Sequence, residues 1–293
     1  MDINQLEVLV AVAREKSFSR AAEALGRTQP AISQSIRRLE EEIGEPLFDR
    51  SSKDGTLTLA GETLLEHARQ MLNLRRSAEA ALREIRGLKR GRVTISANEH
   101  TVLYLLPVIE QFYHRHPSIK VEVQRGVASR IPKEVLAREV ELGVISFSPS
   151  DASLKAIPVM NDRLTLIVSP RHALAGRDEV TIRDLANERF IAHNAVSPYR
   201  DLVISAFEKQ NATLNIAVEL PSLEAIKKLV ARGIGIALVP RLSAAEEIAS
   251  GQLSGVKVRE LKLERKLNIV YRKNSTLSHA ARAFLDVAVE MGR

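Results

Sequence analysis

The feature that most narrows the possible folds is a glycine turn between two short amphipathic segments, in residues 17–34, SFSRAAEALGRTQPAISQ. Ser17 or Ser19 can cap a short helix that runs through Leu25. Gly26 then follows in a position where a positive φ is needed, which glycine adopts at little cost. This stretch predicts a short helix that ends in a tight turn.

A longer helix is predicted directly after that turn. Thr28 is suited to be its N-cap, and Pro30 falls in the first turn, where a missing N–H does no harm. The apolar stripe of this helix is formed by Ile32, Ile36, Leu39 and Ile43, and an earlier helix is predicted from apolar spacing between Ile3 and Ala13. Two helices joined by a glycine turn form the helix-turn-helix pattern.

The polar face of the longer helix carries side chains that can read DNA bases. Its outward N-terminal half holds Gln29, Ser33, Gln34 and Arg37. Gln suits adenine, Arg suits guanine and Ser suits either, while Thr28 and the first-turn amides suit a phosphate. The alternative is that this is the solvated face of any amphipathic helix.

A small β-wing and a long helix are predicted next. Turn residues 51–55 separate two β-prone pieces, residues 47–48 and 56–59. Residues 60–88 then carry a heptad seam, typical of a helix that pairs with another, formed by Leu64, Ala68, Met71, Arg75, Ala78, Leu82 and Ile85. Arg75 either sets the register of that pairing or extends out of the interface. The sequence GLKRG at 87–91 is a candidate hinge.

From residue 92 onward, predicted strands and helices alternate, which indicates βαβ units on a mainly parallel sheet. Two segments, residues 113–145 and 207–239, share one order of helix end, turn, strand, helix, glycine and strand. We therefore predict two α/β lobes of similar build. Ligands of such sheets bind beyond the carboxyl ends of the strands, so we expect a binding cleft between the lobes.

Composition sets further limits on the function. The net charge is +7, yet residues 1–60 hold 8 Lys and Arg against 10 Asp and Glu, so bulk basicity does not locate a DNA site. The chain has no cysteine, which excludes disulfides and thiolate metal sites and fits the cytoplasm. No apolar run is long enough for a membrane span, and the N-terminus lacks the features of a signal peptide.

Other kinds of site are poorly supported. His114 and His116 lie at a helix end without a clear third ligand, so we expect no metal site. His193, Ser197 and Asp201 contain the ingredients of a catalytic triad, but the chain has no G-x-S-x-G elbow. The glycines of ARGIGIALVP precede a strand and do not form a dinucleotide fingerprint. We therefore expect no enzyme and no cofactor.

The run FSRAAEALGRTQPAISQSIRRLEEEIGEPLFDR, followed by LTLAGETLLEHA, closely resembles the N-terminal domain of the LysR-type transcriptional regulators. The resemblance continues more loosely through LYLLP, LAGRD and VARGIGIALVPR. It implies an α+β multidomain chain with a winged helix-turn-helix at 1–59, a linker dimerisation helix and hinge at 60–91, and a two-lobed periplasmic-binding-protein-like effector domain at 92–293. Lobe I would comprise about 92–161 with 268–293, and lobe II about 162–267.

The resemblance also implies partners and site residues. The partners are promoter double-stranded DNA with an inverted repeat, a small-molecule effector of unknown identity, and further copies of the chain, as a dimer or tetramer through the linker helix. The DNA-binding residues by position are Thr28, Gln29, Pro30, Ser33, Gln34, Arg37, Arg50, Lys53 and Thr58. The effector-binding residues by position are Asn98, Glu99, His100, Thr101, Gly126, Ala128, Phe147, Ser197 and Arg200.

Several alternatives stay open at this stage. The start of the helix after residue 98 has free N–H groups that suit an anion. Glu99 opposes a simple carboxylate there, so the effector is cationic, zwitterionic or neutral, or else Glu99 points to solvent. Arg200 is equally compatible with an ion pair between the lobes or at the surface. A solute-binding protein would share the two lobes, and a non-specific DNA-binding structural protein would share the DNA contacts.

Overall fold

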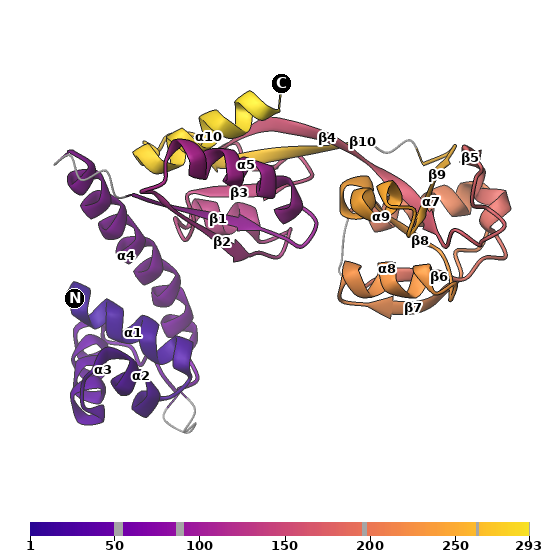
Figure 1. Ribbon diagram of the computed structural model, residues 1–293. Coiled ribbons are helices and arrows are strands. Elements are labelled where there is room, and N and C mark those ends of the chain that lie inside the picture. The colour runs from indigo at the N-terminus through magenta and orange to yellow at the C-terminus, as the bar shows by residue number, and fades with distance from the viewer. Residues whose placement is uncertain (50–54, 86–90, 195–197, 262–263, 293) are drawn as a thin grey trace. The chain divides into compact units, whose positions relative to one another are not determined.

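A computed structural model describes residues 1–49, 55–85, 91–194, 198–261 and 264–292 of the chain (Figure 1). It forms two compact units, each described here by itself: Met1–Gly91 with Glu134–Val140, and Arg92–Lys133 with Glu141–Arg293. The predicted contacts of Arg50, Lys53 and Ser197, and most of the predicted hinge, lie outside the described residues.

The first unit begins with the predicted helices, α1 (Ile3–Glu15), α2 (Phe18–Leu25) and α3 (Gln29–Ile43). Ser17 is the N-cap of α2, since its hydroxyl accepts from the N–H of Arg20, and Gly26 ends α2 at φ 63°. Thr28 is the N-cap of α3, but its side chain makes no capping hydrogen bond. The helix-turn-helix prediction is therefore confirmed in its local detail.

The core of this unit forms where α1, α2 and α3 meet. Ile32, Ile36 and Leu39 are buried in it beside Leu6 and Leu9 of α1. Ile43 was predicted to extend the same stripe, and this is wrong, because 39% of its surface is exposed. It is the last residue of α3, where the packing against the other helices ends.

The wing is present as an isolated antiparallel bridge between Phe48 and Leu57. Backbone N–H groups of Asp49 and Thr58 donate to the carbonyls of Thr56 and Leu47. The ring of Phe48 meets that of Phe18 edge-on at 5.3 Å. The base of the wing is thus part of the core of the unit.

The predicted heptad seam lies on the long helix α4 (Leu59–Ile85), and its residues fall into two parts that differ in burial. Ala68 is fully buried in the core of the same unit, with Leu64 packed against it. Met71 and Leu82 instead expose 43% and 60% of their surface. The first part of the seam therefore packs within its own chain, because α1 covers it, and the second part stays open.

The second unit contains a mixed sheet in which the strands nearest its start are parallel. β1 pairs with β2 and β3 in parallel, and β10 pairs antiparallel with β3 and β4. α5 and α10 pack on this sheet and share its core (Figure 1). Lobe I comprises β1 (Arg92–Ala97), α5 (Val102–Arg115), β2 (Lys120–Arg125), β3 (Leu142–Ile145) and α10 (His279–Met291). The short helix α6 (Ile131–Leu136) is divided between the two units, since Glu134–Val140 belong to the first.

Lobe II is built around the second half of β4, which pairs antiparallel with β8 and β9. β6 pairs in parallel with β7, and a bridge between Phe190 and Ile236 joins β6 to the start of β8. The elements of lobe II are β5 (Glu179–Val180), β6 (Phe190–His193), α7 (Pro198–Lys209), β7 (Ile216–Leu220), α8 (Leu223–Ala231), β8 (Ala237–Pro240), α9 (Ala245–Ala249) and β9 (Ser254–Val258). Two 3₁₀ turns, η1 (Ile182–Leu185) and η2 (Arg241–Ala244), complete it.

Two long strands, β4 (Leu154–Val168) and β10 (Glu264–Arg272), connect the lobes. β4 begins at Leu154 and pairs with β10 from Leu154 to Arg163, before its second half enters lobe II. Asp162 and Arg265 are direct partners in this connecting ribbon. In the described part of the chain, no helix has the length and apolar character that crossing a membrane requires.

Candidate functional site

The predicted base-reading residues share the exposed face of α3, where two of them are restrained by contacts along the helix. Gln29 Nε2 donates to Ser33 Oγ at 3.0 Å, and Arg37 Nε lies 3.0 Å from Glu41 Oε1. Gln34 is exposed on the same side, and the Arg37 side chain is 75% exposed. The N-terminal half of α3 therefore presents amide, hydroxyl and guanidinium groups to a partner.

Two further DNA candidates differ from each other. Thr28 is exposed and its hydroxyl is not used as a cap, so it is available to a phosphate. The Thr58 hydroxyl is engaged within the domain, because it donates to the Pro46 carbonyl at 2.6 Å and accepts from the Gly61 N–H at 3.0 Å. This disfavours Thr58 as a DNA contact. Pro30 is exposed in the first turn of α3.

The acidic residues late in α3 hold the domain together. Glu40 Oε1 accepts from the N–H groups of Leu47 and Phe48, at 2.8 and 3.3 Å, and so fixes the approach to the wing. An open groove of about 760 Å³ beside them is lined by Glu40, Glu41, Glu45 and Asp49, and also by Arg37. The four carboxylates disfavour a phosphate backbone within the groove, with Arg37 at its edge toward the N-terminal half of α3.

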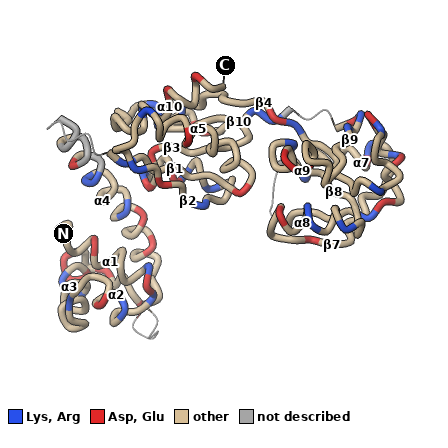
Figure 2. Tube along the Cα trace, viewed as in Figure 1, with Lys and Arg blue, Asp and Glu red and all other residues tan. Residues whose placement is uncertain are grey.

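Charge is mixed along the helices of the first unit, with acidic and basic residues interspersed (Figure 2). A base-reading helix start, and not a uniformly basic surface, is the feature that suits nucleic acid in this unit. This agrees with the local excess of acidic residues in positions 1–60.

In lobe I, the loop after β1 is closed by its own hydrogen bonds. Asn98 Oδ1 accepts from the N–H groups of His100 and Thr101, and the Asn98 carbonyl accepts from Val102. Thr101 is fully buried, and its hydroxyl donates to the Val144 carbonyl at 3.2 Å. Asn98 therefore already occupies three N–H groups at the approach to α5, those of His100, Thr101 and Val102, so these three are not free as predicted.

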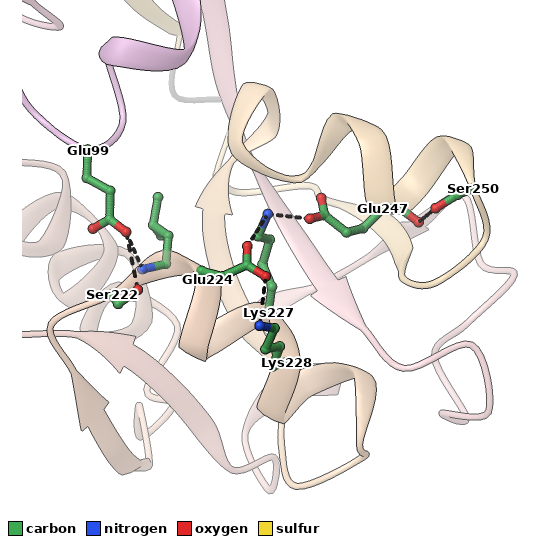
Figure 3. A network of polar contacts seen from close by, with 8 residues as sticks. Glu99, Ser222, Glu224, Lys227, Lys228, Glu247 and Ser250 are labelled. Atoms are coloured by element: carbon green, nitrogen blue, oxygen red, sulfur yellow. Dashed lines mark hydrogen bonds and ion pairs between the residues drawn. The ribbon is translucent and has the colours of Figure 1, made fainter.

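Glu99 extends from this loop to lobe II (Figure 3). Its Oε1 accepts from the Leu223 N–H at 2.9 Å and lies 3.4 Å from Ser222 Oγ, at the start of α8. Its Oε2 lies 3.3 Å from His193 Nε2 at the end of β6. Neither alternative for Glu99, a ligand contact or exposure to solvent, anticipated polar contacts across the lobes.

Next to Glu99, His100 is a half-buried residue whose imidazole stays neutral. Burial, together with the nearby positive charge of Arg265 and the ring of His193, lowers the pKa of His100 to about 4, although Glu99 opposes this. The rings of His100 and His193 lie 5.4 Å apart. Its Nδ1 has no hydrogen-bond partner among the residues described.

A second contact between the lobes lies at the connecting ribbon. Arg265 Nη1 forms a buried ion pair with Asp162 Oδ2 at 3.1 Å, and its guanidinium lies 4.7 Å from the ring centre of Tyr199. The Tyr199 hydroxyl donates to the Ser146 carbonyl in lobe I at 2.5 Å. Asp162 also accepts from the Leu242 N–H. The Asp162–Arg265 ion pair and the ring and hydroxyl of Tyr199 thus connect the ribbon to both lobes.

A cavity of about 590 Å³ lies between the loop after β1, the end of β2 and the start of α8. Of the predicted effector residues, Asn98 and Glu99 line it. The lining also includes Val102, Val123, Gln124, Arg125, Pro221 and Ser222. The cavity has both an acid and a base at its wall, together with amide and hydroxyl groups, so it suits a small polar ligand.

Other predicted effector residues lie apart from the cavity wall. Gly126 is buried, and a Cβ there would lie 2.2 Å from Ser96 Oγ, so only glycine fits. Ala128 is half-buried, and the Phe147 carbonyl accepts from Asn268. Arg200 pairs with Glu219 at 2.5 Å and donates to the His193 carbonyl, so its ion pair lies within lobe II.

Sequence reasoning missed Gln124, Arg125 and Ser222. For the first two a signal was available, because β1 and β2 are parallel and their carboxyl ends meet at one edge of the sheet. Ser222 had no comparable signal, since its place at the cavity depends on how lobe II folds.

Comparison with known proteins follows the same division of the chain. The model of the bacterial regulatory helix-turn-helix protein, lysR family, matches residues 3–62. The model of the LysR substrate binding domain matches residues 86–293, which is more than half of the chain.

Similar proteins match along nearly the whole chain. A probable RuBisCO transcriptional regulator of Gracilaria tenuistipitata var. liui is 34% identical over 289 residues, covering 96% of this chain and 94% of that protein. The RuBisCO operon transcriptional regulator of Allochromatium vinosum is 30% identical over 285 residues, covering 97% and 94%. The fold matches that of full-length CbnR, solved with its target DNA, with a TM-score of 0.75 at 21% identity and full coverage of both chains.

The exposed polar face of α3, the two lobes joined by β4 and β10, and these matches agree with one another. The chain belongs to the LysR family of transcriptional regulators, with a helix-turn-helix DNA-binding domain and an effector-binding domain.

Proposed function

We propose that this protein reads a promoter inverted repeat with the N-terminal half of α3, and that a small molecule between its two lobes controls this binding. The observation that carries the first part is the exposed set Gln29, Gln34 and Arg37 on one helix face, with a free Thr28 hydroxyl at the helix start. Bidentate amide and guanidinium groups are the side chains that distinguish base pairs in the major groove.

We assign the chain to a DNA-binding domain at 1–59, a linker at 60–91 and an effector domain at 92–293, acting in the cytoplasm without an enzymatic step. Membership of the LysR family supports this order of domains. The supporting feature for the effector is the cavity of about 590 Å³, whose wall combines Glu99 and Arg125 with neutral polar groups.

We propose that the open half of α4 pairs with a second copy of the chain. Met71 and Leu82, two residues of the predicted heptad seam, are exposed there, and so is Leu74. Ala68, earlier in the seam, is buried within the unit. Exposed apolar side chains in a heptad arrangement favour association with a like helix. A dimer would place two α3 helices on the two halves of an inverted repeat.

A footprinting experiment tests the proposal. The full-length protein should protect an inverted repeat in promoter DNA, and a RuBisCO operon promoter is the first candidate, given the names of the similar proteins. Protection of the repeat should be lost on substitution of Gln34 and Arg37 together. If the protein binds random DNA as tightly as every tested promoter, over a range of salt concentrations, sequence-specific regulation is excluded.

A further inference from the structure

Three groups from lobe II converge on the Glu99 carboxylate of lobe I. They are the Leu223 N–H, the Ser222 hydroxyl and the His193 imidazole, at 2.9, 3.4 and 3.3 Å. They come from two elements, the end of β6 and the start of α8. A helix N–H, a hydroxyl and an imidazole together are suited to bind a carboxylate. In this chain the bound carboxylate is a side chain of the other lobe.

The contact is a feature of the tertiary fold and not of local structure. Glu99 is separated by 94 residues from His193 and by 124 from Leu223. Its side chain keeps 32% of its surface exposed, and it lines the cavity of about 590 Å³ together with Ser222. A carboxylate that only stabilised a core would be enclosed. Glu99 instead lies at the wall of the space in which a ligand is expected.

The lobe II elements that hold Glu99 are themselves anchored. Lys227, one turn into α8, pairs with Glu224 of the same helix and with Glu247 of α9 (Figure 3). The Arg200 guanidinium donates to the carbonyl of His193. The donors around Glu99 are therefore fixed by lobe II, and the Glu99 side chain, which is 32% exposed, is the partner that a change of rotamer can withdraw.

One buried polar atom beside this contact, Nδ1 of His100, lacks a hydrogen-bond partner among the described residues. The His100 ring lies 5.4 Å from the His193 ring. Buried polar groups without partners are rare in folded proteins, and a polar ligand is one way to satisfy them. This atom is a second observation, separate from the Glu99 contacts, that favours a polar ligand here.

We propose that Glu99 is a tethered substitute for the carboxylate of the effector. Without effector, it fastens lobe I to lobe II by occupying the Leu223, Ser222 and His193 donors. An effector that carries a carboxylate binds by displacing Glu99 from these donors, while its remaining atoms contact the wall formed by Asn98, Gln124 and Arg125. This inference rests on the proposed function, because it concerns the cleft assigned to the effector.

The exchange has a physical consequence for affinity. The donors lose one carboxylate and gain another, so they contribute little net free energy to binding. Because Glu99 is tethered, it competes at a high effective concentration. Removal of Glu99 should therefore expose a site that accepts even a minimal carboxylate such as acetate.

The test uses the full-length protein in three forms: unchanged, Glu99→Ala and Glu110→Ala. Glu110 is the matched control, an exposed acid of lobe I on α5. Hydrogen exchange of the Leu223 amide should be faster by about tenfold or more in E99A, because a charged acceptor has been removed, and unchanged in E110A. Sodium acetate, compared with sodium chloride at equal ionic strength, should raise the melting temperature of E99A but not of the other two.

The proposal is overturned if Leu223 exchanges equally in all three proteins, or if acetate has the same effect on each. Should E99A fail to fold, E99Q keeps the size of the side chain and removes its charge, and its Leu223 amide should still exchange faster than in E110Q. The footprint of the unchanged protein is measured in parallel. Loss of specific DNA binding by that protein would contradict the proposed function, while the exchange and acetate measurements would still decide the role of Glu99.

Discussion

Arg75 on α4 pairs with Glu7 on α1, with Nη1 and Oε1 3.1 Å apart, and also with Glu79 one turn along its own helix at 2.8 Å. Arg75 therefore links the linker helix to the DNA-binding helices at the point where α4 leaves the core. It was predicted either to set the register of a helix pair or to extend away from it. In the single chain, its charge is used within the unit. Exposed ion pairs contribute little to stability, so the effect of this pair is mainly on orientation.

The open apolar surface of α4 leads to the first prediction. Leu82→Asp should weaken self-association by about thirtyfold or more, as expected when a residue central to an interface, worth about 2 kcal/mol, is lost. Sedimentation velocity over a range of concentrations measures this. Leu59→Asp is the control, since Leu59 is 82% exposed at the first residue of the same helix. Equal weakening by both changes would argue against pairing through the second half of α4.

A second prediction separates base reading from phosphate binding. Arg37→Ala should cost about 1–3 kcal/mol on the specific promoter and much less on random DNA, because it removes a contact to a base edge. Lys53→Ala should weaken binding to both DNAs alike and flatten the dependence on salt. Fluorescence anisotropy titrations at several salt concentrations provide both quantities. The division is refuted if the two variants lose specific and random binding in the same proportion.

The third prediction concerns pH. The pKa of His100 falls from its usual 6.5 to about 4 in the folded protein, chiefly because of burial, with Arg265 and His193 adding to the effect. Between pH 6.5 and about pH 4, His100 binds a proton in the unfolded chain but not in the folded chain. Stability present above pH 6.5 is therefore lost as the pH falls from 6.5 toward 4. The loss amounts to at most about 3 kcal/mol.

His100→Asn should remove this part of the acid sensitivity. Melting temperatures at neutral pH and at about pH 5 should differ less in the variant than in the unchanged protein. His114→Asn, which alters an exposed histidine of α5, should keep the full difference. An acid sensitivity that is the same in all three proteins would show that another group is responsible.

The buried pair in the connecting ribbon gives a fourth prediction. Asp162 and Arg265 are each 5% exposed in their side chains. Asp162→Asn leaves the Arg265 guanidinium buried without its counter-charge and should cost about 3–5 kcal/mol. Urea unfolding of the effector unit, followed within the full-length protein, measures the loss. Asp286→Asn, an exposed acid on α10, is the control. A loss below about 1 kcal/mol would mean that solvent reaches the pair.

Local chemistry explains which parts of the fold were predictable. Ser17 and Gly26 act on their own turn, so the ends of α2 followed from residue type. The first half of β4 did not, because Pro158 and the polar run Asn161–Arg163 resemble a loop, and only pairing with β10, about a hundred residues later, makes it a strand. Ile43 fits the apolar period of α3, but it is the last residue of that helix and 39% of its surface stays exposed.

The candidate site shows the same limit. The exposed face of α3 followed from helical phase, because one helix contains all of its residues. The partner of Glu99 could not be predicted, since Leu223 lies 124 residues away and belongs to a lobe whose placement depends on the whole ribbon. Asn98 illustrates a different failure, in which a short polar side chain supplied the acceptors that we had expected from a ligand.

The two lobes share β4 and β10 over their length and meet again at Glu99 and at Tyr199. A two-stranded ribbon resists stretching along its length, because the backbone of each strand is already nearly fully extended, but it twists readily. If Glu99 is released, the ribbon and its buried ion pair still hold the lobes at a set separation. The easiest remaining motion is a rotation of one lobe about the ribbon axis. Effector binding would then rotate the lobes relative to each other without changing the distance between them.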